Sequence, residues 1–199
     1  MTRLVEWDRR ALRAGAEAVL DVYAEAMGVP RLLAAARRSI LVAHLEREGL
    51  RTVAALDDRD RLVGIAYGYV GAPGQWWRDQ VQAALDCSIG PEQAQAWLRE
   101  AFEVCELHVR PGSQGTGLGR ALLDRLLDGA PSATALLTTP DTETRARGFY
   151  RAGGWVDLAR QLHFPGDPRS FAVLGLHLPA PGAPRHGASS VQAESGAAS

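Results

Sequence analysis

The chain has 199 residues, 22 basic and 23 acidic side chains, and a formal net charge of −1. This length is sufficient for one domain with a sizeable core. The near-zero charge argues against a nucleic-acid partner or an anionic membrane surface. Apart from histidine, every basic residue is arginine.

The two cysteines, Cys87 and Cys105, form no CxxC pair and are too few for a disulfide framework. We therefore expect a reducing, cytoplasmic setting. The N-terminus lacks the apolar centre of a signal peptide, and no apolar run approaches the ~20 residues of a membrane helix. The histidines lie far apart and show no metal-ligand spacing, so we expect no metal.

The first part of the chain predicts a short strand, two helices and a β-hairpin. The strand spans about residues 4–7. Apolar side chains at helical spacing predict helices over 8–27 and 31–48, separated by a break that contains glycine and proline. Two segments, 50–56 and 61–70, flank an aspartate-rich turn and predict the paired strands of a hairpin.

The middle of the chain predicts a helical insert and an irregular strand. The insert covers 71–101 and falls into two helical pieces at a glycine–proline break. The strand covers 102–109, and its apolar residues change parity between Val104 and Leu107. A one-residue change of phase is what a β-bulge produces, so we expect a bulge near Cys105 and Glu106.

The last part predicts alternating helices and strands. A glycine-rich loop over 110–117 precedes a helix that ends near Leu127. We then expect a strand over 135–139, a helix over 141–152, and strands over 155–158 and 171–176, listed here in chain order. The domain is expected to span 1–178, and the Ala-, Gly-, Ser- and Pro-rich segment 179–199 to be a disordered tail.

The glycine loop carries the most informative chemistry. Gly115, Gly117 and Gly119 allow a ligand to approach the backbone closely, and the following helix directs its free N–H groups at the loop. Such a site suits phosphate or pyrophosphate. A P-loop is excluded because the chain has no lysine, and the spacing does not fit GxGxxG. The alternative is a glycine-rich turn before a core helix.

Two motifs together resemble the GNAT superfamily of acetyl-CoA-dependent N-acetyltransferases. Gln114, Gly117 and Gly119 match its Gln/Arg-x-x-Gly-x-Gly/Ala motif, and the segment 145–155 resembles its later helix, which ends in Tyr-x-x-x-Gly-Phe/Trp. The resemblance covers about residues 2–177. It implies an α/β (α+β) fold with a mixed, mostly antiparallel sheet, flanking helices and the glycine loop after the fourth strand.

The resemblance also implies a co-substrate, acetyl-CoA, and the residues that hold it. Main-chain groups of the strand would contact the pantetheine arm and the thioester; these belong to Leu107, His108 and Val109. The loop would hold the pyrophosphate through Gln114, Gly115, Thr116, Gly117, Leu118, Gly119 and Arg120. Tyr150 would protonate the departing thiolate; the alternative is that Tyr150 is simply a core aromatic residue.

A general base is harder to assign from the sequence. Glu106 lies beside the expected bulge and is our candidate, although it could equally be a solvated strand residue. A histidine side chain can serve as a base near neutral pH, but for His108 we expect the backbone to matter more. The strand at Leu136 lacks the acidic base of some family members, and Glu143 replaces an asparagine that often contacts CoA.

The resemblance predicts acetyl transfer to a primary amine of a small molecule or peptide, by direct attack on the thioester. Because no base is evident, the alternative is a non-catalytic protein that senses CoA or a metabolite. Candidate acceptor-pocket residues are Tyr23, Glu25 and His44. Trp76 and Trp77 are candidates for a pocket wall or a homodimer contact, or they pack the insert onto the sheet.

Overall fold

The computed structural model describes residues 2–179, so the expected tail lies outside the described residues except for Pro179. Within residues 2–179, seven strands form one sheet in the order β1-β2-β3-β4-β5-β7-β6. Their bounds are β1 Arg3–Glu6, β2 Arg51–Leu56, β3 Leu62–Val70, β4 Phe102–Val109, β5 Thr134–Pro140, β6 Val156–His163 and β7 Ser170–His177. Among these described strands only β4 and β5 pair in parallel, so the expected mixed, mostly antiparallel sheet is confirmed.

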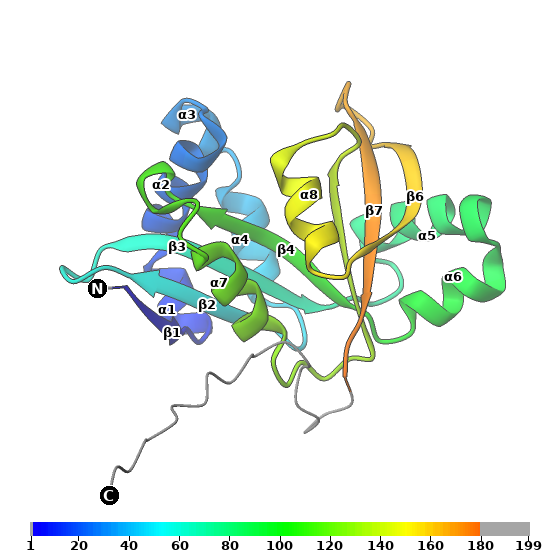
Figure 1. The fold of residues 1–199 in the computed structure, drawn as a ribbon, viewed down its shortest axis with the longest axis horizontal. Coiled ribbons are helices and arrows are strands. Elements are labelled where there is room, and N and C mark those ends of the chain that lie inside the picture. The colour runs from blue at the N-terminus through cyan, green and yellow to red at the C-terminus, as the bar shows by residue number, and fades with distance from the viewer. Residues whose placement is uncertain (1, 180–199) are drawn as a thin grey trace, which may run out of the picture.

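Helices cover both faces of this sheet (Figure 1). Their bounds are α1 Arg9–Ala14, α2 Ala16–Met27, α3 Arg31–Ala35, α4 Arg38–Leu45, α5 Trp76–Ile89, α6 Pro91–Leu98, the 3-10 helix η1 Pro111–Ser113, α7 Leu118–Leu127 and α8 Arg145–Ala152. One face carries α7 and α8. On the opposite face, α1, α2 and α4 cover one end of the sheet, and α5 and α6 cover the other end.

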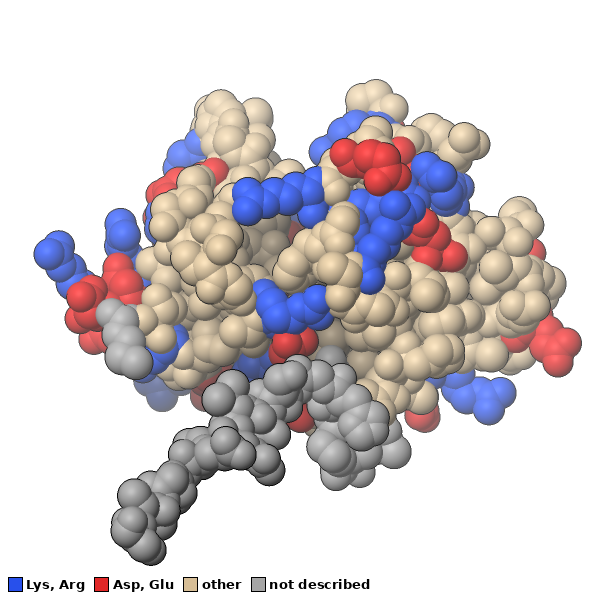
Figure 2. Space-filling model, viewed as in Figure 1, with Lys and Arg blue, Asp and Glu red and all other residues tan. Residues whose placement is uncertain are grey.

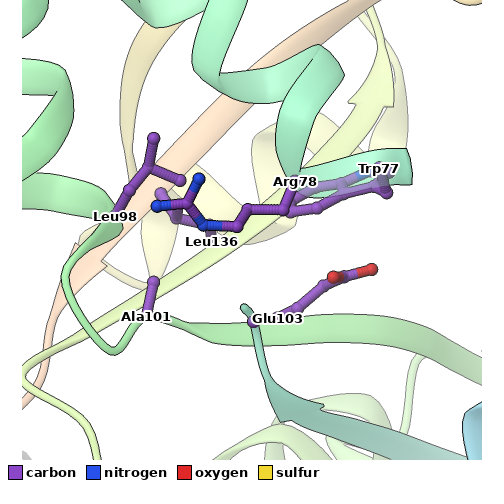
Figure 3. A pocket seen from close by; sticks show the side chains of 7 residues that line it. Trp77, Arg78, Leu98, Ala101, Glu103 and Leu136 are labelled. Carbon is purple, nitrogen blue, oxygen red and sulfur yellow. The ribbon is translucent and has the colours of Figure 1, made fainter. Parts of the chain in front are cut away.

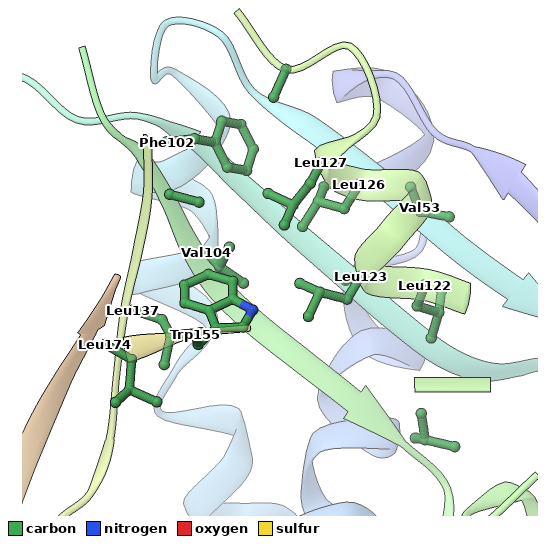
Figure 4. Close-up of a cluster of buried hydrophobic side chains, with 14 of the residues drawn as sticks. Val53, Phe102, Val104, Leu122, Leu123, Leu126, Leu127, Leu137, Trp155 and Leu174 are labelled. Carbon is green, nitrogen blue, oxygen red and sulfur yellow. The ribbon is translucent and has the colours of Figure 1, made fainter. Parts of the chain in front are cut away.

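The main apolar core lies between the sheet and α7 (Figure 4). Leu122, Leu123, Leu126 and Leu127 of α7 are buried against alternate residues of the strands. Trp155, which follows α8, completes this core at its other side. The helical spacing of four leucines therefore fixes which face of α7 packs on the sheet. The loop before α7 lies at the end of β4.

The two N-terminal helices are each interrupted, so the prediction of two continuous helices was wrong. Gly15 separates α1 from α2 because the Trp7 ring packs against it; a Cβ on Gly15 would lie 2.6 Å from that ring. A second interruption separates α3 from α4 and makes Arg37 the N-cap residue of α4. This interruption directs Arg37 toward β4, as described below.

The insert forms two helices, as predicted. Gly90 has φ of 86° and ends α5, and Pro91 begins α6. These helices pack on β5, β6 and β7 through a separate apolar cluster that includes Val81, Leu85 and Leu98. The insert therefore extends the fold at one end of the sheet and leaves the centre of β4 uncovered by it.

The helix α8 begins at Arg145, four positions later than predicted. Thr144 has extended backbone, and its side chain accepts a hydrogen bond from the Arg147 N–H, so it acts as the N-cap. The Arg147 side chain is fully buried and pairs with Asp141 at 2.6 Å and Asp157 at 2.9 Å. These two ion pairs hold α8 against the ends of β5 and β6.

The strands β4 and β5 pair only at one end. Their register contains Phe102 with Ala135 and Glu103 with Leu136, and no later pair. Beyond this point β4 continues alongside β3, and β5 continues alongside β7. The sheet is therefore split between its two halves, and in the described part of the chain the backbone of β4 from Val104 onward has no strand partner on the side toward β5.

The predicted bulge is confirmed in β4. Tyr67 pairs with Glu106, while the next residue of β3, Gly68, pairs with Val104, which leaves Cys105 without a partner. The bulge changes the side-chain alternation, so Cys105 packs with the α2–α4 cluster, whereas Val104 and Val109 belong to the α7 core. As a result, Glu106 and His108 both point toward α2 and α4.

Glu103 is a buried acid near the point where the sheet splits. Figure 3 shows its side chain extending from β4 in a small cavity that is also lined by Trp77 and Arg78 of α5. Its Oε2 atom has no hydrogen-bond partner among residues 2–179. Burial raises the pKa of Glu103 to about 7, although hydrogen bonds from Tyr69 and Cys105 act in the opposite direction.

We predict that Glu103→Gln will stabilise the protein at neutral and alkaline pH. The raised pKa means that the folded carboxyl keeps its proton while the unfolded one loses it, so stability falls as pH rises from about 4.5 to about 7. The neutral variant avoids this loss, which amounts to about 3 kcal/mol.

Thermal unfolding of both proteins between about pH 5 and about pH 8 tests this prediction, because the range spans the raised pKa. The difference in Tm, variant minus wild type, should increase with pH. A difference that stays constant would show that Glu103 titrates normally in the folded protein.

Candidate active site

The loop between β4 and α7 is held in a defined shape by its own hydrogen bonds. The Gln114 Nε2 atom donates to the Val109 carbonyl oxygen at 2.9 Å, and the Thr116 hydroxyl donates to the Ser113 carbonyl at 2.9 Å. Gly115 and Gly117 adopt φ of 77° and 84°, which a residue with a side chain reaches only under strain. Gln114 thus joins the loop to the end of β4.

Free backbone donors gather at this loop. Among residues 2–179, no hydrogen bond uses the N–H groups of Gly115, Thr116 or Gly117. The first turn of α7 adds the N–H groups of Leu118, Gly119 and Arg120, which a helix start leaves without intrahelical partners. Together with the positive end of the helix dipole, these donors fit a pyrophosphate.

Arginine side chains add positive charge to the same face (Figure 2). Arg145, at the start of α8, lies 3.5 Å from where a Cβ on Gly115 would be. Arg147 and Arg151 nearby are paired with acids, whereas no ion pair within residues 2–179 uses Arg145. The sequence analysis did not single out Arg145, because only the folded chain brings α8 against the loop.

Arg120 has a different environment from the one expected. Its guanidinium lies over the Phe149 ring at 5.4 Å, crowds Gly153, and lies 3.8 Å from Asp124. The side chain of Arg120 therefore braces α7 against α8. Its backbone N–H remains one of the donors at the start of α7.

Tyr150 lies on α8, on the same face of the sheet as the glycine loop. Its ring contacts Phe149 and Trp155 edge-on, with centroid distances of 5.1 and 5.6 Å, and packs against the α7 core. Burial raises the pKa of Tyr150, and the negative charge of Glu106 raises it further. The phenol therefore stays protonated at neutral pH and can donate a proton or a hydrogen bond.

Glu106 and His108 lie on the opposite face, toward α2 and α4. One Glu106 carboxylate oxygen accepts from Arg37 at 2.5 Å, and the other lies 2.5 Å from the Nε2 atom of His108. The Glu106 and His108 side chains are each 13% exposed. Burial tends to raise the pKa of Glu106, but His108 and Arg37 outweigh burial and hold the pKa below its usual range.

A pocket opens above these two side chains. Val19, Leu20, Ile40 and Leu41 form apolar walls between α2 and α4, and Tyr23, Arg37, Tyr67, Glu106 and His108 supply the polar lining. Tyr23 contacts the His108 ring edge-on at 5.1 Å and lies under the Arg37 guanidinium. The arrangement suits a ligand with an apolar chain and a polar end.

The other predicted pocket residues lie elsewhere. Glu25 forms an ion pair with Arg110 at the end of β4. His44 is behind the pocket floor, where its Nδ1 atom is 3.3 Å from the Tyr67 hydroxyl. Burial lowers the pKa of His44 to about 4, so it is neutral at physiological pH.

The two insert tryptophans have different roles in the fold. Trp77 packs on the α5–α6 cluster and donates through Nε1 to the Thr138 hydroxyl of β5 at 3.2 Å. Trp76 is 56% exposed and lies against Phe164, in the connection between β6 and β7. Trp77 therefore packs the insert onto the sheet, as one of our alternatives held.

Beyond its last pair with β5, β4 presents side chains to both faces of the sheet. Leu107 packs toward the α7 core, while His108 points to the pocket. Of the predicted main-chain contacts, the Val109 carbonyl is already engaged by Gln114. Tyr150 therefore lies on one face of β4, and the Glu106–His108 pair lies on the other.

Within residues 2–179, no group of three or more His, Cys, Asp or Glu side chains could hold a metal ion. Over the same residues, no helix has the length and apolar character needed to cross a membrane.

Comparisons with known proteins agree with this geometry. Residues 16–154 match the family described as the Acetyltransferase (GNAT) family. A GCN5-like protein acetyltransferase of Mycobacterium tuberculosis is 40% identical over 185 residues, which cover 80% of this chain and 90% of that protein.

Solved structures show the same fold at low sequence identity. A GNAT-family structure from Desulfovibrio desulfuricans has a TM-score of 0.64 at 18% identity and covers 89% of this chain and 99% of that one. A Salmonella typhimurium structure with its cofactor acetyl-CoA has a TM-score of 0.61 at 16% identity, covering 94% and 99%. The chain belongs to the GNAT family of acetyltransferases.

Proposed function

We propose that this protein transfers the acetyl group of acetyl-CoA to a primary amine of a peptide or protein, by direct attack of the amine on the thioester. The observation that carries the proposal is the arrangement around the split between β4 and β5. A proton donor, Tyr150, lies on one face, and Glu106 with His108 lies on the other. The free N–H groups of the glycine loop lie on the same face of the sheet as Tyr150.

The residues present fit acetyl-CoA. The free N–H groups of the glycine loop, with Arg145 beside Gly115, match the charge of a pyrophosphate. The unpaired side of β4 offers main-chain groups to an amide-containing arm. When bound, acetyl-CoA supplies an activated acyl group, and the chain's own groups orient it and move the protons.

Two observations favour a peptide or protein as the acceptor. The relative at 40% identity is named a protein acetyltransferase. The pocket that leads to Glu106 has apolar walls, as the aliphatic part of an alkylamine requires. The short helix α3, which packs on α2, exposes Leu32 and Leu33 at 83% and 62%. Exposed apolar side chains of this kind suit a peptide more than a small, highly charged amine.

Turnover with a set of amines tests the proposal. Peptides with a lysine or with only a free α-amine, together with small amines, are incubated with acetyl-CoA, and both CoA release and product mass are measured. Acetylated peptide supports the proposal. Acetyl-CoA binding without turnover on any amine would favour the non-catalytic sensor.

We predict that Gly117→Ala weakens acetyl-CoA binding about tenfold or more, because a side chain at φ of 84° costs about 1–2 kcal/mol and would reshape the loop. Isothermal calorimetry measures the Kd. Gly129→Ala is a matched control, because Gly129 also has positive φ and open space but lies after α7. Equal effects of the two substitutions would contradict a specific role for the loop.

We predict that Tyr150→Phe lowers kcat by about 10²-fold or more while leaving the Kd for acetyl-CoA unchanged. Phenylalanine keeps the ring packing with Trp155 but removes the proton donor. Steady-state kinetics measures kcat, calorimetry measures the Kd, and thermal unfolding checks the fold. Full activity of this variant would rule out a role for Tyr150 as the acid.

A further inference from the structure

The hydrogen-bond pattern around Glu106 distinguishes the two candidate bases. Both carboxylate oxygens are engaged: one by the Arg37 guanidinium and the other by the His108 imidazole, each at 2.5 Å. An amine proton would have to compete with these two partners for Glu106. The carboxylate is thus placed as a fixed anion between two cationic or potentially cationic groups.

The His108 ring has one nitrogen occupied and one available. Its Nε2 atom faces Glu106, so this nitrogen carries the hydrogen when the ring is neutral, and the lone pair is on Nδ1. No hydrogen bond within residues 2–179 uses Nδ1. The ring lines the pocket and is held edge-on against Tyr23. A base oriented by a carboxylate through its second nitrogen is a recurrent arrangement in catalysis.

We propose that His108 accepts the proton of the acceptor amine through Nδ1, and that Glu106 is the positioning residue that fixes the ring and stabilises the imidazolium. This inference rests on the proposed acetyl transfer. It gives the His108 side chain a catalytic role, whereas from the sequence we expected only the backbone of His108 to contribute. Arg37 then has a defined role, because it neutralises Glu106 when His108 is uncharged.

Other groups that face His108 are less suited to take the proton. Tyr23 comes from α2 and Tyr67 from β3, and both are phenols. Arg37, which precedes α4, is a permanent cation. His44 lies behind Tyr67 and is held neutral by burial. Glu106 itself is hydrogen-bonded on both oxygens, which favours its charged form.

Acetyl transfer exchanges one bond at the acyl carbon and moves two protons. The amine nitrogen forms a bond to the acyl carbon, and the bond between that carbon and sulfur breaks. The surplus proton of the amine goes to His108 Nδ1, and the thiolate takes a proton from the Tyr150 hydroxyl. The imidazolium then releases its proton to solvent, and the phenolate regains one, so acetylated amine and CoA thiol are the net products.

The first test compares variants of His108 and Glu106 with a control variant that lies far from the site. We expect His108→Gln to lower kcat by about 10²-fold or more, with an unchanged Kd for acetyl-CoA, because an amide cannot accept a proton at neutral pH. Glu106→Gln should reduce kcat less and retain the acid limb of the pH profile of kcat/KM. This limb should move to lower pH, because an imidazolium without its carboxylate is less stable. His177→Gln, at the end of β7, should behave as wild type.

Rescue by added imidazole distinguishes the loss of a catalytic base from the loss of the fold. If His108→Ala binds acetyl-CoA and unfolds at the wild-type temperature, added imidazole should restore part of its activity, and the rescue should follow the concentration of neutral imidazole. Nitrogen-15 NMR of the wild type provides a readout besides activity. The neutral His108 ring should carry its hydrogen on Nε2, and Glu106→Gln should weaken that preference.

The outcomes distinguish this inference from the proposed function. If the wild type acetylates an amine but His108→Gln keeps its kcat and acid limb, the inference is wrong and the proposed function stands. If Glu106→Gln loses the acid limb while His108→Gln retains it, Glu106 is the base. If the wild type binds acetyl-CoA but turns over no amine, the proposed function itself fails.

Discussion

The strands β4 and β5 separate after two residue pairs, and the candidate active site depends on this separation. A sheet that continued to pair would satisfy the backbone of β4 with β5 and would keep the two faces apart. The split instead leaves main-chain groups available along β4, with α8 on one face of the sheet and α2 and α4 on the other. Each half retains its own partner strand, so the sheet remains stable on both sides of the split.

Several features of the chain maintain this geometry. The bulge at Cys105 redirects β4 just after the last pair with β5, so that Glu106 and His108 both face the pocket. On the other face, the buried Arg147 holds α8 through Asp141 and Asp157, which keeps Tyr150 beside the split. A buried arginine with two carboxylates has little freedom to move, because an unpaired buried charge would be costly.

The electrostatics of the two faces are complementary. On the α7/α8 face of the sheet, burial keeps the Tyr150 phenol protonated. The same face carries the free N–H groups of the glycine loop and nearby arginines. On the α2/α4 face, the Glu106 carboxylate lies between the His108 imidazole and the Arg37 guanidinium. The phenol of Tyr150 and the carboxylate of Glu106 thus have the protonation states that their proposed roles require, and the backbone of β4 lies between them.

Local signals in the sequence determined much of this protein. The parity change after Val104 marked the bulge, glycine spacing marked the loop, and leucines at helical spacing marked α7, because each depends on neighbours a few residues apart. Two motifs in the right order identified the family. Only the tertiary structure decided the contacts of Glu106, because Arg37 lies 69 residues earlier and reaches Glu106 through a helix break that no local pattern marked. The ring of His108, the position of Arg145 and the place of His44 were likewise decided by packing between distant elements.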